Sequence, residues 1–377
     1  MAGIYVHVPF CKKKCGYCDF FSLPFDAADA DEYIGFLLKE AALYGAKLRR
    51  EGLALAFDTV YLGGGTPSLL SADGIGKILE GLDKNFDISK SAEITAEGNP
   101  SDFCDKKKVG EFKAAGVNRL SIGIQTMHGD ILKLLGREQT EELNKAALDA
   151  ATCVFQNVSA DVMLGLPGDS ESRLKYTLDA ISVYDIKHIS AYALKVEEKT
   201  PLDKKIREGI IAPPDDDASV GLYDLTLGYL KERGFTRYEI SNFSKPGYEC
   251  RHNLNYWRRG EYVGLGPAAH GFFGGERYDN PRDLKEYYSA ISRGIVPSAN
   301  VIKIAPKEAL FEKIMLGLRL AEGIDAAGIN AEFGVDFFRE YSGVLTKYGR
   351  CFNLSKTRLS VKDEFFYVIN SLLTEFL

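Results

Sequence analysis

The sequence lacks a long apolar run. None of its 377 residues lies in a stretch approaching the roughly 18 consecutive apolar residues that a membrane-spanning helix needs. The apolar N-terminal segment MAGIYVHVPF has no basic region before it, and Cys11 and three lysines follow it at once, so it differs from a signal peptide. We therefore expect a cytoplasmic protein whose first apolar segment is a buried strand.

An excess of positive charge is also lacking. Lys and Arg number 47 against 53 Asp and Glu, for a formal net charge of −6. Because affinity for nucleic acid comes largely from Lys and Arg on the phosphates, nucleic acid is a poor candidate partner. Internal repeats and low-complexity segments are absent, and the 45% hydrophobic and 27% charged content is typical of a globular protein. At about 150 residues per domain, the length predicts two to three domains.

The cysteines argue against a disulfide framework. There are seven, an odd number, and we expect a reducing compartment. Three of them form Cys11-x3-Cys15-x2-Cys18. Three thiolates on one loop can hold three irons of a [4Fe–4S] cluster and leave the fourth iron open, whereas an electron-transfer cluster uses four cysteines. From spacing alone, a zinc site completed by His7 and a chance grouping stay open as alternatives.

Strand-like and helical segments alternate through the first 200 residues. We expect strands at 4–10, 59–65, 93–100, 119–125, 157–168 and 188–196, and helices at 31–48, 72–82, 106–116, about 128–155 and 170–184. This alternation predicts βαβ units and a parallel sheet, which can curl into a barrel. In such folds ligands bind at the carboxyl ends of the strands. The cysteines, a triple glycine (63–65), Glu97 and Gln125 all fall there.

The pattern changes after residue 200. We expect Asp217 to cap a helix over 218–233, a strand over 237–243, and loop-like structure over 244–283, which is rich in Gly, Pro and aromatics. Helical structure returns at about 305. We therefore divide the chain into a core (1–240), a loop segment covering the core (241–300) and a small C-terminal domain (301–377).

The segment YVHVPFCKKKCGYCDFFS (5–22) resembles the cysteine loop of radical S-adenosylmethionine (SAM) enzymes, and more narrowly of the oxygen-independent coproporphyrinogen III oxidase group. The resemblance continues over most of the chain. It implies a partial (β/α)6 barrel with a small mixed, mainly helical C-terminal domain. It also implies that Cys11, Cys15 and Cys18 hold a [4Fe–4S] cluster whose open iron binds SAM, and that one electron donated by the cluster cleaves the SAM sulfonium to give a 5′-deoxyadenosyl radical.

The same resemblance implies a set of SAM-binding residues. Bare glycines let a backbone approach a ligand, an acidic side chain suits ribose hydroxyls, and an arginine can pair with a carboxylate. The positions that match the family are Tyr5, Tyr17, Gly64, Gly65, Thr66, Glu97, Gln125, Arg137 and Asp161. Taken alone, each of these residues could also have a purely structural role in a turn, in core packing or in a surface ion pair.

Three features assign the chain to the heme chaperone branch of this group rather than to the true oxidases. The oxidases carry a further cysteine two residues after the third ligand, where this chain has Phe20. They also have a long arm before the cysteines, whereas Cys11 stands near the start here. Finally, residues 252–257 read His-Asn-Leu-Asn-Tyr-Trp and fit the HNxxYW motif of the chaperones. One departure is Gln139 beside Arg137, where the chaperones often have histidine.

We therefore expect a heme-binding iron–sulfur protein that delivers heme to haemoproteins, some of them in membranes. The alternative is a SAM-dependent oxidase that decarboxylates a porphyrinogen. His252 is the candidate heme ligand, with Tyr256 and Trp257 as flat apolar surface, although a hydrogen-bonded structural histidine is an equal interpretation. His270 and Cys250 are weaker candidates. The sequence leaves open SAM cleavage, the recipient and a homodimeric assembly.

Overall fold

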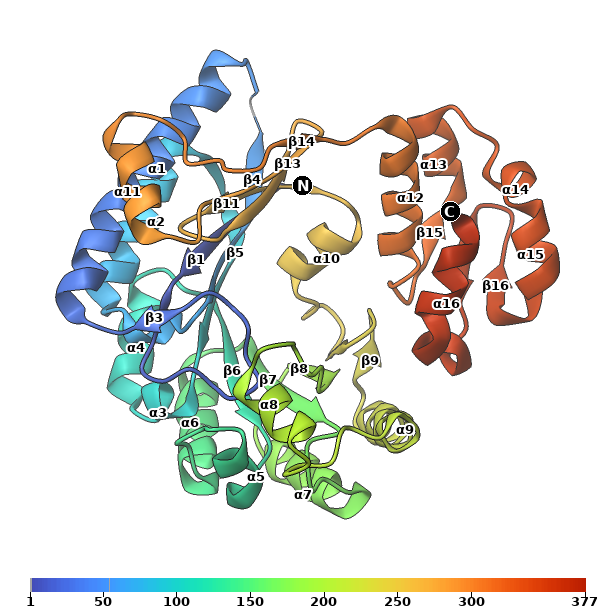
Figure 1. The fold of residues 1–377 in the computed structure, drawn as a ribbon, viewed down its shortest axis with the longest axis horizontal. Helices are drawn as coiled ribbons and strands as arrows, with labels where there is room; N and C mark the ends of the chain where they lie inside the picture. The colour runs from blue at the N-terminus through green and yellow to red at the C-terminus, as the bar shows by residue number, and fades with distance from the viewer. Residues whose placement is uncertain (1, 54) are drawn as a thin grey trace.

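Residues 2–53 and 55–377 are described by the structure, a computed structural model. Six parallel strands form its centre (Figure 1). They are β1 (Ala2–Val8), β4 (Ala56–Gly64), β5 (Asp87–Gly98), β6 (Arg119–Gln125), β7 (Val158–Leu164) and β8 (His188–Ala193). The predicted partial (β/α)6 barrel is confirmed.

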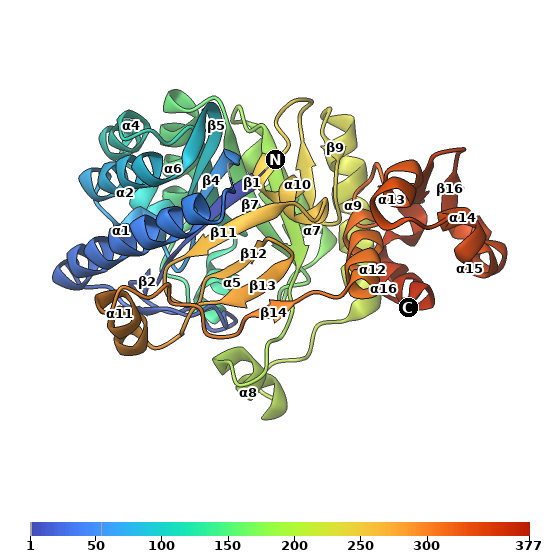
Figure 2. The same cartoon turned by 90° about the horizontal axis from the view of Figure 1, so that it is seen from above.

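Helices connect these strands and cover the outer face of the sheet (Figures 1 and 2). The main ones are α1 (Ala27–Arg50), α2 (Ala72–Asn85), α4 (Lys106–Ala114), α6 (Glu141–Val154), α7 (Glu171–Ser182) and α9 (Asp216–Glu232). Short elements at the carboxyl ends of the strands are β2 (Phe10–Cys11), β3 (Leu23–Pro24), α3 (Pro100–Phe103), α5 (Gly129–Leu134) and α8 (Pro201–Arg207).

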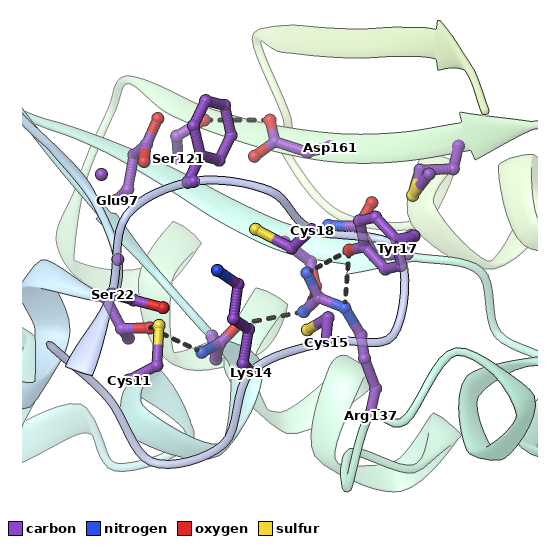
Figure 3. A pocket seen from close by; sticks show the side chains of 18 of the residues that line it. Cys11, Lys14, Cys15, Tyr17, Cys18, Ser22, Glu97, Ser121, Arg137 and Asp161 are labelled. Carbon is purple, nitrogen blue, oxygen red and sulfur yellow. Dashed lines mark hydrogen bonds between the residues drawn. The ribbon is translucent and has the colours of Figure 1, made fainter. Parts of the chain in front are cut away.

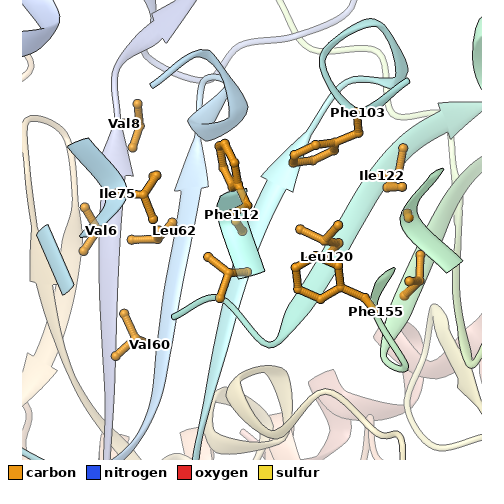
Figure 4. Packing of buried hydrophobic residues seen from close by; sticks show 14 of the residues in the cluster. Val6, Val8, Val60, Leu62, Ile75, Phe103, Phe112, Leu120, Ile122 and Phe155 are labelled. Carbon is orange, nitrogen blue, oxygen red and sulfur yellow. The ribbon is translucent and has the colours of Figure 1, made fainter. Parts of the chain in front are cut away.

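Side chains alternate between the two faces of the strands, and this alternation separates the core from the site. On β4 and β6, Val60, Leu62, Leu120 and Ile122 point outward and pack on the helices (Figure 4). Their odd-numbered neighbours point inward, because successive strand residues face opposite ways. The inward residues are largely polar: Tyr61 on β4, Glu97 on β5, Ser121 and Gln125 on β6, and Asp161 on β7. The barrel interior is therefore chemically distinct from the core.

Residues 242–303 add strands at both edges of the barrel. β11 (Glu261–Leu265) pairs in parallel with β1. It continues through the antiparallel strands β12 (His270–Phe273), β13 (Glu276–Asp279) and β14 (Ile302–Lys303). The prediction of loop-like structure over 244–283 is wrong, since short strands with glycine turns have too little periodicity to detect. Helices α10 (Arg251–Trp257) and α11 (Leu284–Ser292) flank these strands.

Two smaller predictions are corrected. Asp215, not Asp217, caps α9, because its carboxylate accepts a hydrogen bond from the Ala218 amide. The strand predicted over 237–243 is broken into β9 (Thr236–Arg237) and β10 (Asn242–Ser244). The break arises at Glu239, whose buried carboxylate accepts hydrogen bonds from the Ser241 amide and the Asn242 side chain.

A separate apolar core holds the C-terminal part together. Its helices are α12 (Pro306–Gly317), α13 (Ala326–Phe333), α14 (Phe337–Glu340), α15 (Ser342–Tyr348) and α16 (Ile369–Leu373). Its small sheet contains β15 (Ile324–Asp325), β17 (Arg358–Val361) and β16 (Phe352–Leu354). The guanidinium of Arg237 lies 3.3 Å from the centroid of the Phe366 ring and pairs with Asp363, which joins the two parts. No helix among the described residues is long and apolar enough to cross a bilayer.

Candidate functional site

A cavity of about 520 Å³ opens at the carboxyl ends of the parallel strands (Figure 3). All three motif cysteines line it. So do eight of the nine residues that the family resemblance assigned to SAM: Tyr17, Gly64, Gly65, Thr66, Glu97, Gln125, Arg137 and Asp161. The residues lie far apart in the sequence and meet because most of them follow or end neighbouring strands of the barrel, whereas Asp161 points inward from the middle of β7.

The cysteine loop wraps one side of this cavity. Cys11 ends β2, and Cys15 and Cys18 follow in a loop whose thiols point inward (Figure 3). Two backbone hydrogen bonds of 2.8 Å hold the loop at Gly16, whose amide donates to Leu135 and whose carbonyl accepts from Leu202. All three cysteines are half-buried and free of disulfides. Burial raises the pKa of the Cys18 thiol.

This arrangement suits a cluster better than a single metal ion. Over residues 2–53 and 55–377, no three His, Cys, Asp or Glu side chains converge on one ion position. A four-iron cluster makes no such demand, because each thiolate binds a different iron. The ring of His7 is already engaged. Its Nε2 lies 2.8 Å from the Phe21 carbonyl and its Nδ1 lies 3.2 Å from the Tyr5 hydroxyl. The geometry therefore does not favour the zinc alternative.

The triple glycine brings the end of β4 against the cysteine loop. Gly64 has a φ of +103°, and a Cβ there would lie 2.6 Å from the His7 ring. A Cβ on Gly65 would lie 2.6 Å from the Phe10 carbonyl oxygen. Only glycine fits at these contacts. Thr66, which follows, donates a hydrogen bond from its hydroxyl to Cys11 Sγ at 3.5 Å.

Arg137 lines the cavity and links other lining residues through its hydrogen bonds. It donates from Nε and Nη2 to the Tyr17 hydroxyl at 3.1 and 2.7 Å, and from Nη1 to Asn99 Oδ1 at 2.9 Å. Gln139 accepts a further hydrogen bond from Nη1 at 3.1 Å, while its own amide donates to the Gly123 and Ile124 carbonyls. Gln139 is buried and does not line the cavity, so it holds Arg137 in place from behind the lining residues.

Two half-buried carboxyl groups face the barrel interior. Glu97 accepts a hydrogen bond of 2.6 Å from the Tyr61 hydroxyl, and its burial raises its pKa to about 7. Asp161 accepts hydrogen bonds from Ser121 and Ser159 at 2.9 and 3.2 Å, and burial raises its pKa too. Gln125, with a φ of +65°, accepts from Tyr192. The carboxyl groups of Glu97 and Asp161 therefore offer hydrogen-bond acceptors for hydroxyl groups of a ligand.

Tyr5 and His252 lie outside the cysteine cavity. Both line a neighbouring cavity of about 230 Å³. His252 is buried at 1% exposure, and both ring nitrogens are engaged: Nδ1 with Thr59 Oγ1 at 2.7 Å and Nε2 with the Tyr256 hydroxyl at 2.8 Å. Burial lowers the pKa of His252 to about 3. In this conformation it has no nitrogen free for iron, so the geometry favours the structural interpretation that the sequence left open.

The other residues of the HNxxYW region do not form one surface. Tyr256 faces the barrel interior, whereas Trp257 lines a cavity between α10 and the C-terminal part. The Cys250 thiol is buried and donates to Glu93 Oε1 at 3.5 Å, and its burial raises its pKa to about 12.

Sequence reasoning missed several cavity residues, among them Tyr61, Asn99, Ser121, Tyr192 and Asn242. Tyr61 and Ser121 could have been found, because they stand at inward positions of predicted strands. Asn99 follows Glu97 by two residues, beyond the strand. Tyr192 belongs to β8 and Asn242 to β10, and no motif in the sequence marks either residue as facing a ligand.

Two family models match the chain. The model of the radical SAM superfamily matches residues 5–181, and the model of the HemN C-terminal domain matches residues 304–364. Among solved structures, the coproporphyrinogen III oxidase HemN of Escherichia coli superposes with a TM-score of 0.84 at 22% identity, covering 100% of this chain and 89% of that one. At this identity the likeness shows the fold.

Curated relatives identify the family within the superfamily to which the chain belongs. The protein named heme chaperone HemW of Mycobacterium tuberculosis is 35% identical over 333 residues, covering 87% of this chain and 84% of the relative. The protein of the same name from Bacillus subtilis is 33% identical over 337 residues, covering 89% and 87%. That of Lactococcus lactis is 29% identical over 379 residues, covering 99% and 96%. With its cysteine loop and the cavity beneath it, the chain belongs to the heme chaperone HemW family of the radical SAM superfamily.

Proposed function

We propose that this protein binds heme and hands it to haemoproteins, as the name of its relatives states. The observation that carries the proposal is the relationship to the HemW proteins over nearly the full length of both chains. A feature of the site supports it. Phe20 stands where the oxidases of the group carry a further cysteine, and this residue is 65% exposed and lines the cysteine cavity. A phenylalanine there offers an apolar surface and no thiol chemistry.

We propose further that Cys11, Cys15 and Cys18 hold a [4Fe–4S] cluster, which superfamily membership implies. When bound, such a cluster supplies an electron and an open iron for SAM. Arg137 offers a guanidinium for the SAM carboxylate, and its hydrogen bonds to Tyr17 and Asn99 fix its orientation. Gly64, Gly65 and Thr66 offer a close backbone approach, and Glu97, Gln125 and Asp161 offer acceptors for the ribose and amino groups. Tyr5, behind Glu97, is a packing partner of Tyr61.

We propose in addition that the recipients are haemoproteins, some of them in membranes, and that the protein acts in the cytoplasm. The division at residues 240 and 300 separates the barrel, the segment with the HNxxYW motif and the C-terminal domain. A homodimer is the assembly to test first.

Titration with heme tests the proposal. Protein reconstituted anaerobically with iron and sulfide is titrated with hemin and followed by absorbance, with the apoprotein as reference. Saturable binding of one heme per chain is expected. Absence of saturable binding would overturn the chaperone function and leave porphyrinogen decarboxylation as the activity to assay.

A further inference from the structure

A third cavity adjoins the cysteine cavity on the other side of Phe20. Its volume is about 390 Å³. The cysteine-loop residues Asp19, Phe20 and Phe21 form one wall. The opposite wall comes from β11, β12 and the segment after β13: Tyr262, Ala268, His270 and Arg282. Phe20 also lines the other two cavities of the barrel interior, so it stands at the junction of all three.

His270 differs from the other four histidines of the chain. His7, His188 and His252 each use both ring nitrogens in hydrogen bonds, and His128 uses Nε2 toward the Arg173 carbonyl. The side chain of His270 is exposed, and within residues 2–53 and 55–377 no hydrogen bond reaches its ring. A neutral imidazole with a free nitrogen is the form that binds iron. Of the two histidines that line this third cavity, only His270 is free to do so.

The turn before β12 and the pairing of β12 with β11 place His270 at the cavity. It begins β12 after a tight turn in which Gly266 has a φ of +93° and Ala268 a φ of +60°. For alanine a left-handed conformation is strained, and such strain is maintained where the surrounding structure demands a particular chain path. On β11 and β12, Tyr262 lies directly opposite Phe272, and His270 shares the face of Phe272 two residues away. His270 and Tyr262 therefore face the cavity together.

The other residues that line this cavity have the chemistry that a porphyrin with its propionates would need. Phe20 supplies an exposed ring, and Tyr256 and Tyr262 pack edge to face with centroids 4.5 Å apart. Arg282 is exposed and lies at the same cavity, where a guanidinium pairs with carboxylates. Asp19 is the one carboxylate among the lining residues, so propionates are expected on the Arg282 side. The cavity thus combines an imidazole, aromatic faces and a cation.

We infer that this third cavity is the heme site, with His270 as the iron ligand and Arg282 as a partner of a heme propionate. The inference rests on the proposed heme binding and replaces His252 as the ligand. His252 becomes a positioning residue, since its Nε2 holds the hydroxyl of Tyr256 in the cavity wall. An open cavity leaves one edge of the heme accessible to an acceptor protein, which suits transfer.

Ligand replacement tests the assignment in the full-length reconstituted protein. Hemin is titrated into wild type, His270→Ala, His252→Ala and, as a matched control away from the cavity, His128→Ala. Electron paramagnetic resonance reports on the iron ligands. Wild type, His252→Ala and His128→Ala are expected to show imidazole ligation. His270→Ala is expected to lose it, and added imidazole is expected to restore it. Restoration of a lost ligand field by imidazole is a readout that a merely structural role would not give.

Arg282 is tested with a second ligand. Arg282→Ala is expected to weaken hemin binding about tenfold, the equivalent of one charge-assisted hydrogen bond. It is expected to leave binding of the hemin dimethyl ester, which has no free carboxylates, unchanged. If wild type binds no heme, the proposed function itself fails. If wild type binds heme and His270→Ala keeps imidazole ligation while His252→Ala loses it, this inference fails and the chaperone function stands.

Discussion

The guanidinium of Arg137 and the phenol of Tyr17 are joined by two hydrogen bonds, of 3.1 Å from Nε and 2.7 Å from Nη2. This contact ties the segment after α5 to Tyr17, one of the two residues between the second and third cysteines of the loop. It places a fixed positive charge beside the cysteines, and it orients that charge toward the cavity in which we propose that SAM binds.

Replacing Arg137 is therefore expected to weaken SAM binding. Arg137→Ala removes the charge that pairs with the SAM carboxylate, and the affinity is expected to fall about ten- to a hundredfold. Tyr17→Phe leaves the charge but removes its acceptor, so a smaller loss is expected. Isothermal titration of reconstituted protein with SAM gives both values. Arg173→Ala, a surface arginine paired with Asp130, is the control and should bind SAM as wild type does. Unchanged affinity in Arg137→Ala would refute the assigned role.

The motif cysteines and the remaining cysteines are expected to behave differently on reconstitution. Cys15→Ala leaves only two thiolates on the loop, so the variant should retain little cluster iron and sulfide and lose the cluster absorbance. Cys104→Ser changes an exposed cysteine outside the cavity and should reconstitute fully. Iron and sulfide analysis after gel filtration checks both variants. A full cluster in Cys15→Ala would contradict the ligand assignment.

The hydrogen bond between Thr59 and His252 is expected to support the fold. Thr59 is fully buried, and Thr59→Val leaves the His252 Nδ1 without its partner. The free energy of unfolding should fall by about 1–3 kcal/mol. Thr95→Val is the matched control on the next strand, because the buried Thr95 hydroxyl has no hydrogen-bond partner among the described residues. Denaturant titration compares the two. Equal effects would show that His252 is not held by this bond.

Glu40 is expected to make the stability depend on pH. Its buried carboxyl accepts hydrogen bonds from the Gly266 amide, Asn280 and Tyr287, and burial raises its pKa to about 7. The folded state therefore holds the proton more tightly than the unfolded chain does. The contribution of Glu40 to the free energy of unfolding is complete below the ordinary glutamate pKa. It is lost as the pH rises toward 7, and the total loss is roughly 3 kcal/mol.

The variant Glu40→Gln cannot ionise, so its stability should decline less between pH 5 and pH 8. Glu80→Gln, at an exposed residue paired with Lys84, should follow the wild-type decline. Denaturant unfolding at several pH values measures the three slopes. Parallel curves for wild type and Glu40→Gln would show that the carboxyl does not titrate in this range.

Much of the barrel was predictable, because its strands and helices are long and local signals define them. The strand predicted at 119–125 has those same bounds, and the residues at strand ends do meet in one cavity. The edges of the sheet were not predictable. β11 pairs with β1 across most of the chain, and β12 and β13 have four residues each, so their composition resembles a loop.

The side-chain positions of the HNxxYW motif were likewise not predictable from the sequence. The sequence places Tyr256 and Trp257 side by side, but successive helix positions point in different directions, so the two residues line separate cavities. His252 carries a motif, yet both of its nitrogens are occupied by side chains, one of them 193 residues away in the sequence. Which histidine is free depends on such distant contacts.

A direct comparison of binding and catalysis tests the central claim. One batch of reconstituted, heme-free protein is divided. One half is titrated with hemin, and the other is incubated with coproporphyrinogen III, SAM and a reductant, with products identified by mass spectrometry. We predict one heme bound per chain and no decarboxylated product above a control that lacks the cluster. Turnover to the decarboxylated product without saturable heme binding would contradict the account and identify an oxidase.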